Sequence, residues 1–111
     1  MNREELLDFH AELCQRARDL MSRKNHDYAG QRGDDQDPFA NFRLCAALRL
    51  CSVEEGVLVR LCDKISRLAT FATAGNLLVQ DEKVEDTVLD IINYAVILAA
   101  LVKEKRGKEK T

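Results

Sequence analysis

Two acids and an amide fall on one stripe of a predicted helix in the last third of the chain. Asp86, Asp90 and Asn93 are spaced at i, i+4 and i+7, so they lie on one helical face. Acids in a first turn suit the helix dipole, which accounts for Asp86 without a site. Asp90 and Asn93 lie deeper, among hydrophobic neighbours, where a carboxylate is costly to bury unless it is paired or bound to a cation. Asp90 and Asn93 are therefore candidates for a functional role.

A second polar stripe lies on the helix predicted before it. Asp63 and Lys64 are flanked by Arg60 and Arg67, all within a narrow arc of that helix. Cations of this kind recognise phosphate oxygens, and Mg²⁺ is held by one or two carboxylates together with the phosphates. The alternative is a solvated face, because Asp63 and Arg67 also make an ordinary i,i+4 surface pair. These four residues alone favour the solvated face, and the acids on the following helix strengthen the case for a phosphate site.

The composition favours a small domain with an aliphatic core. The chain has 111 residues, of which 46% are hydrophobic and only 5% aromatic. One proline and five glycines are too few for the many turns of a β-sandwich or barrel. The net charge of −2 offers no broad attraction to a polyanion, so we expect no duplex nucleic acid as a partner.

The cysteine pattern and the N-terminus predict a cytoplasmic protein. The four cysteines (Cys14, Cys45, Cys51 and Cys62) form no C-x-x-C pair and no metal-binding spacing with histidine, so free thiols in a reducing cytosol are expected. The charged N-terminus does not resemble a secretory leader. The longest apolar run, residues 94–102, is far shorter than the ~20 residues that cross a bilayer, so we expect no membrane partner.

Hydrophobic periodicity predicts an all-α fold of four helices. The helices are expected at residues 3–24, 38–50, 53–74 and 83–104, within a single domain of residues 1–104 followed by a polar tail at 105–111. A long loop at residues 25–37 could close over a site as a lid. Three sequence signals mark helix starts: Asn2 with Glu5, Asp37 with Pro38, and the S-x-x-E box of Ser52 with Glu55.

Two of these helices carry distinctive apolar patterns. The third predicted helix has an apolar stripe of five residues: Leu58, Leu61, Ile65, Leu68 and Ala72. The fourth is apolar in nearly every direction around its axis, so neighbours must cover most of its sides. Four helices this short provide little cover, so we expect a homodimer or a higher homo-oligomer that completes a four-helix bundle.

Four segments of the chain resemble a known family. KNHDYAG, DPFANFR, EEGVLVRLCDKISRL and EDTVLDIINYAVIL, in this order, resemble the first type of nucleotide-modification-associated domain, found largely in phages and bacteria. That family is similar in plan to the all-helical MazG-like and dimeric dUTPase-like nucleoside triphosphate pyrophosphohydrolases. The resemblance covers about residues 24–98. It implies an oligomeric helical bundle with a nucleotide site between helices.

The resemblance also implies roles for individual residues. If the chain is a hydrolase, Asp63, Asp90 and Lys64 would serve catalysis, and Asp63, Asp86 and Asp90 would hold a bound Mg²⁺. Eight further residues are expected to contact the nucleotide: Lys24, Asp27, Tyr28, Asn41, Arg60, Arg67, Asn93 and Tyr94.

One departure from the related hydrolases bears on catalysis. Their first metal motif is E-E-x-x-E, whose place is taken here by Val59, Arg60 and Asp63, so two of its three acids are missing. Their second motif, E-x-x-D, reads Thr87-x-x-Asp90 here. The resemblance thus implies the fold and nucleotide binding, and it leaves hydrolysis open. A non-catalytic helical interaction module in a phage or bacterial complex is the alternative.

Overall fold

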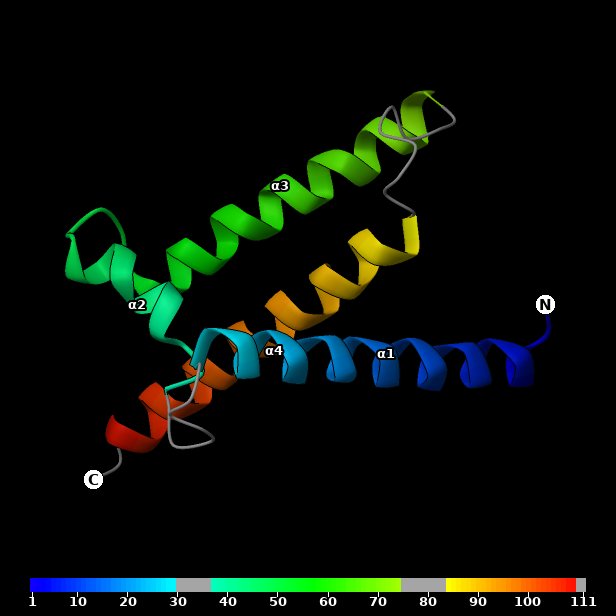
Figure 1. Ribbon diagram of the computed structural model, residues 1–111. Helices are drawn as coiled ribbons and strands as arrows, with labels where there is room; N and C mark the ends of the chain where they lie inside the picture. The colour runs from blue at the N-terminus through cyan, green and yellow to red at the C-terminus, as the bar shows by residue number, and fades with distance from the viewer. Residues whose placement is uncertain (30–36, 75–83, 110–111) are drawn as a thin grey trace. The chain divides into compact units, whose positions relative to one another are not determined.

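A computed structural model describes residues 1–29, 37–74 and 84–109, and those residues form helices and no strand. The chain divides into two compact units, Met1–Gln36 and Asp37–Thr111, and each is described by itself. The first unit contains α1 (Arg3–Ala29), and the second contains α2 (Ala40–Ala47), α3 (Val53–Ala74) and α4 (Val84–Glu109) (Figure 1). The all-α class and the four helices are as predicted. Among the described residues, no helix has both the length and the apolar character to cross a membrane.

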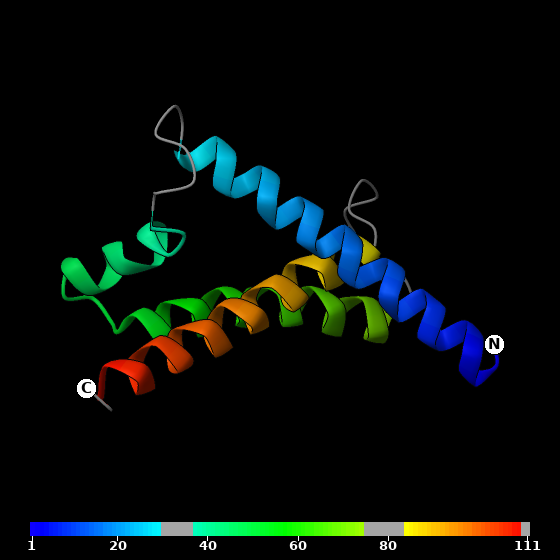
Figure 2. The ribbon, with the colours of Figure 1, turned by 90° about the horizontal axis from the view of Figure 1, so that it is seen from below.

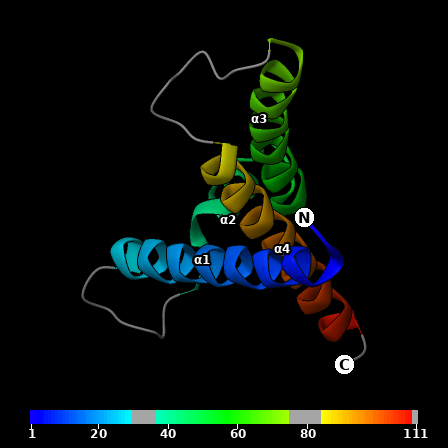
Figure 3. The same cartoon turned by 90° about the vertical axis from the view of Figure 1, so that its right-hand side faces the viewer.

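Helix α1 is one uninterrupted helix (Figures 2 and 3). Its start is fixed by a reciprocal pair: the Glu5 backbone N–H donates to Asn2 Oδ1 at 2.8 Å, and the Asn2 N–H donates to Glu5 Oε2 at 3.0 Å. The helix continues to Ala29, so the loop predicted from residue 25 was wrong over residues 25–29. Nothing in those five residues forbids a helix, and the first strong helix breaker is Gly30. The rest of the predicted loop, residues 30–36, lies outside the described residues.

Helix α2 is shorter than predicted at both ends. Pro38 and Phe39 form a turn rather than the first helical residues: Asp37 Oδ1 accepts a hydrogen bond from the Phe39 N–H at 3.0 Å, and the helix begins at Ala40. At the other end, the Leu50 N–H donates to the carbonyl of Cys45 at 3.0 Å, while Arg49 has a positive φ of 59°. This is the Schellman arrangement, which ends a helix and reverses the chain.

Helix α3 begins as its sequence predicts. The Glu55 N–H donates to Ser52 Oγ and the Ser52 N–H donates to Glu55 Oε1, both at 3.1 Å. These two bonds satisfy donors that a helix N-terminus otherwise leaves without partners, and α3 starts at Val53. The predicted stop signal at residues 75–76 lies outside the described residues.

Helices α3 and α4 lie side by side and run in opposite directions (Figures 1 and 2). The core of this unit takes one buried side chain from each of its three helices: Phe42 from α2, Val57 from α3 and Leu101 from α4. Five half-buried hydrophobic residues pack against them: Phe39, Val53, Tyr94, Ile97 and Leu98. All of these are aliphatic or aromatic, and their burial supplies the main stabilisation of the three-helix unit.

The buried face of α3 overlaps the predicted apolar stripe only in part, because Leu61 and Leu68 are half-buried. Leu58 and Ile65 are 46% and 53% exposed, whereas Val57 is fully buried and the Lys64 side chain is only 16% exposed. Two apolar stripes run next to each other on this helix, and periodicity alone does not say which one meets α4. The structure places the stripe that contains Lys64 in the interior, where a charge needs a partner.

Helix α4 extends five residues beyond its predicted end. It continues through most of the predicted polar tail to Glu109, and Lys108 pairs with Glu104 at 3.3 Å. Lysine, arginine and glutamate are good helix formers, and Arg106 and Lys108 in the last turn suit the negative end of the helix dipole. The polar segment predicted to follow the domain is therefore helical up to Glu109.

Candidate functional site

The two polar stripes predicted from the sequence meet where α3 and α4 pack together. Lys64 Nζ lies 2.9 Å from Asp90 Oδ2, and these side chains are only 16% and 17% exposed. The countercharge that Asp90 requires is thus supplied by the protein itself, from the neighbouring helix.

One turn before Lys64, an arginine stacks on an aromatic pair. The guanidinium carbon of Arg60 lies 4.6 Å from the centre of the Phe42 ring, which is a cation–π contact. Tyr94 meets the same ring edge-on, with the ring centres 6.2 Å apart and an interplanar angle of 85°. Three helices therefore contribute to one cluster, since Phe42 comes from α2, Arg60 from α3 and Tyr94 from α4.

The three predicted metal-binding acids have different surroundings. Asp90 is paired with Lys64, while Asp63 is 63% exposed and pairs with Arg67 at 3.5 Å. Asp86 is exposed in the first turn of α4. Within the described ranges, no three His, Cys, Asp or Glu side chains are grouped so that they could hold a metal ion. As they stand, these acids do not fit a three-carboxylate cage.

The remaining predicted nucleotide contacts lie in different parts of the chain. Asn93 is buried within α4, and no buried side-chain polar atom of the described residues lacks a hydrogen-bond partner, so its amide is satisfied by the protein. Asn41 is exposed on the first turn of α2. Lys24 is exposed on α1, in the other unit. Asp27 and Tyr28 belong to the same helix, but their side chains lie outside the described part of the structure.

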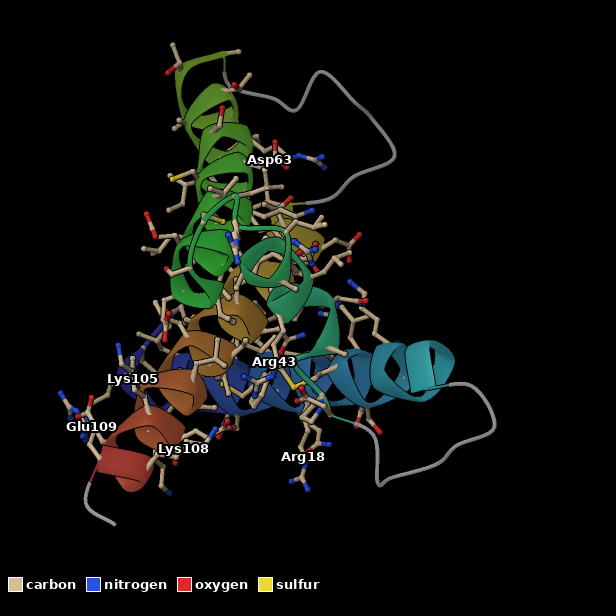
Figure 4. The ribbon with its side chains drawn as sticks, turned by 90° about the vertical axis from the view of Figure 1, so that its left-hand side faces the viewer. Arg18, Arg43, Asp63, Lys105, Lys108 and Glu109 are labelled. Atoms are coloured by element: carbon tan, nitrogen blue, oxygen red, sulfur yellow. The ribbon has the colours of Figure 1, made fainter. Side chains whose placement is uncertain are left out.

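A second charged cluster was missed by the sequence analysis. Arg43 of α2 donates from Nε to Asp37 and from an Nη to Glu104 of α4 at 3.0 Å, beside the last turns of α4 (Figure 4). Its guanidinium carbon also lies 5.5 Å from the centre of the Phe39 ring. No sequence spacing predicts the bond to Glu104, because the two residues belong to helices far apart in the chain.

These contacts shift the pKa of both acids. Partial burial acts to raise the pKa of Asp37, but the hydrogen bonds from Arg43 and from the Phe39 N–H outweigh it and lower the pKa. Hydrogen bonds from Arg43 and Lys108 lower the pKa of Glu104. Arg43 therefore ties both the start of α2 and the end of α4 through ionised carboxylates.

Comparisons with models of protein families, with characterised proteins and with solved structures found no significant match to this chain.

Proposed function

We propose that this chain binds a nucleotide over the face of α3 that carries the exposed Arg60 and Arg67, beside the Lys64–Asp90 pair. The observation that carries the proposal is the stacking of Arg60 on Phe42, one turn from the buried Lys64–Asp90 pair. The sequence resemblance to nucleotide-modification-associated domains, noted above on four segments, supports the same class of ligand.

An arginine held over an aromatic ring suits phosphate recognition. The guanidinium has five N–H donors, and the Phe42 ring, whose centre lies 4.6 Å from the guanidinium carbon of Arg60, contains no oxygen or nitrogen atom that accepts them. Phe42 thus limits the motion of Arg60 without using the donors that bind phosphate oxygens in bidentate fashion. Arg67 lies two turns further along the same face, and its pair with Asp63 is partly exposed and easily exchanged for a more highly charged anion.

A titration with nucleotides tests this proposal. At 100 times its Kd, a ligand of the folded state adds about 2.7 kcal/mol to the free energy of unfolding, which a thermal shift detects. Arg60→Met keeps a long side chain over Phe42 and removes the donors, so the Kd is expected to rise about tenfold or more. Arg106→Met, in the exposed last turn of α4, is the matched control and should leave the Kd unchanged. If no nucleoside mono-, di- or triphosphate shifts the melting temperature, the proposal is wrong.

Hydrolysis of the bound nucleotide is a separate prediction and needs an assay of its own. The pyrophosphohydrolase hypothesis needs Mg²⁺ to bring together Asp63, Asp86 and Asp90, which are not grouped for metal binding in the described residues. Release of pyrophosphate from a nucleoside triphosphate, dependent on added Mg²⁺, would establish it. Binding without release would make the chain a nucleotide-binding protein only.

Exposed apolar side chains favour a second role, in which helical faces bind another protein chain. Leu44, Leu48 and Leu50, at and after the end of α2, are 59%, 60% and 75% exposed. Leu58 and Ile65 on α3 are also exposed. We propose that such faces form the interface of a homo-oligomer. Light scattering should give at least twice the monomer mass at micromolar concentration, and a clean monomer would contradict it.

A further inference from the structure

Two cysteines lie beside one another where α2 ends and α3 begins. A Cβ atom built on Gly56 would lie 2.6 Å from the Cys45 sulfur and 3.8 Å from the Cys51 sulfur, so both thiols pack against the same point on α3. Both are half-buried, and both are free thiols. The sequence, which places them six residues apart, gives no C-x-x-C signal for this pairing.

Backbone structure on both sides holds the two cysteines in place. The Schellman bond from the Leu50 N–H to the Cys45 carbonyl folds the chain back, so that Cys51 returns to the last turns of α2. The Cys45 thiol donates to the carbonyl of Phe42 at 2.9 Å and lies 3.6 Å from the carbonyl of Ser52. Ser52 is itself fixed by its box with Glu55. Two helix-terminal motifs therefore bring the backbone of the two cysteines together.

Gly56 is part of this arrangement. Glycine inside a helix costs about 1 kcal/mol relative to alanine. Here any larger residue would place its Cβ against the Cys45 sulfur, at a distance that such atoms do not adopt. The helix thus keeps a residue without a side chain at the point where the thiol pair needs room.

We propose that Cys45 and Cys51 form a dithiol modification site that closes to an intrachain disulfide on reaction with a low-molecular-weight disulfide. One cysteine thiolate attacks a sulfur of the reagent, forms a mixed disulfide and releases one thiol of the reagent. The second cysteine then attacks the protein sulfur of that mixed disulfide and releases the second reagent thiol. Both cysteines are oxidised, the reagent disulfide is reduced to two thiols, and two cysteine protons are given up in exchange.

The chemistry of the pair favours a bridge that persists once it has formed. The hydrogen bond with Cys45, together with burial, raises the pKa of the Cys51 thiol. A thiol of high pKa is a slow nucleophile at neutral pH and a poor leaving group from a disulfide. The bridge is thus expected to form slowly and to resist reduction.

Tryptic mapping of the full chain tests the proposal, because each cysteine falls on a different peptide. Fully reduced protein is incubated with oxidised glutathione, quenched with an alkylating agent and digested. Cleavage after Arg43, Arg49 and Arg60 yields peptides 44–49 and 50–60, and we expect these two to be joined by a reducible bond. The peptides of Cys14 and Cys62 should remain monomeric, as alkylated or glutathionylated species.

Cysteine variants test whether the disulfide joins Cys45 to Cys51. Cys45→Ser and Cys51→Ser should each abolish the joined peptides and leave a glutathione adduct on the remaining partner. A chain with both Cys14→Ser and Cys62→Ser should form the bridge as the original chain does. Adducts on Cys45 or Cys51 without joined peptides, or pairing spread evenly over all four cysteines, would overturn the proposal. The test uses no nucleotide, so its result does not depend on the function proposed above.

Discussion

The Nζ of Lys64 on α3 lies 2.9 Å from Oδ2 of Asp90 on α4, with more than four-fifths of each side chain buried. Both charges have lost most of their contact with water, and each offsets the desolvation of the other. Turning either helix by a single residue position would carry its charge away from the other, so the pair is compatible with the packing that buries Val57 and leaves Leu58 exposed.

Replacing one member of this pair is expected to destabilise the protein. Asp90→Asn keeps the volume of the side chain but removes the charge that offsets Lys64, in a site with little water. We expect the free energy of unfolding to fall by about 1–3 kcal/mol, measured by urea denaturation at neutral pH.

Two further variants test whether the destabilisation by Asp90→Asn comes from breaking the Lys64–Asp90 pair or simply from removing a carboxylate. Asp63→Asn removes an exposed acid next to Lys64 in the α3 sequence and should change stability by no more than about 0.5 kcal/mol. The double variant Lys64→Met with Asp90→Asn removes both charges and should recover most of the loss. A double variant less stable than Asp90→Asn alone would show that Lys64 stabilises the fold in another way.

The helix starts of this chain were easier to predict than the faces that its helices bury. The Ser52–Glu55 box is a local signal, because both partners lie within one turn and their bonds form whatever the rest of the chain does. The inner face of α3 is not local, since the burial of Lys64 depends on a carboxylate in the next helix. For the same reason the contact of Arg60 with Phe42 could not be predicted, although Arg60 was recognised as a binding candidate.

The charged cluster around Arg43 predicts a loss of stability in acid. The pKa values of Asp37 and Glu104 are lower in the folded chain than their ordinary values of 3.8 and 4.5. Their stabilising effect is therefore fully present above those ordinary values and is lost as the pH falls through the lowered ones. Arg43→Gln should lower the melting temperature at pH 7, and the difference from the original chain should shrink below about pH 4. A difference that is equal at both pH values would show that Arg43 acts only through its contact with Phe39.

Removing the capping box of α3 is expected to lower the stability of the protein. Ser52→Ala removes the acceptor of the Glu55 N–H and should lower the free energy of unfolding by about 1 kcal/mol. Ser52→Thr keeps a hydroxyl group as acceptor, so the free energy of unfolding should fall by less than in Ser52→Ala. Ser66→Ala, at an exposed position inside the same helix, controls for the intrinsic helix preference of alanine and should be neutral or slightly stabilising. Equal effects at residues 52 and 66 would contradict the role of the box.

The effect of Gly56→Ala on the free energy of unfolding is expected to change sign when the Cys45 sulfur is removed. In the original chain, Gly56→Ala gains about 1 kcal/mol of helix preference but places a Cβ 2.6 Å from the Cys45 sulfur. Displacing the thiol also breaks its hydrogen bond to Phe42, so the overpacking cost of about 1–3 kcal/mol should win and the variant should be less stable.

In a chain that already carries Cys45→Ala, the sulfur is gone and the nearest atom of residue 45, its Cβ, lies at an ordinary contact distance of 3.9 Å. Gly56→Ala should then raise the free energy of unfolding by about 0.5–1 kcal/mol, because only the gain in helix preference remains. Urea denaturation of all four chains, in reductant, measures both effects and their difference. If Gly56→Ala changes stability by the same amount with and without the Cys45 thiol, then the sulfur does not occupy the space beside residue 56, and the glycine is there for another reason.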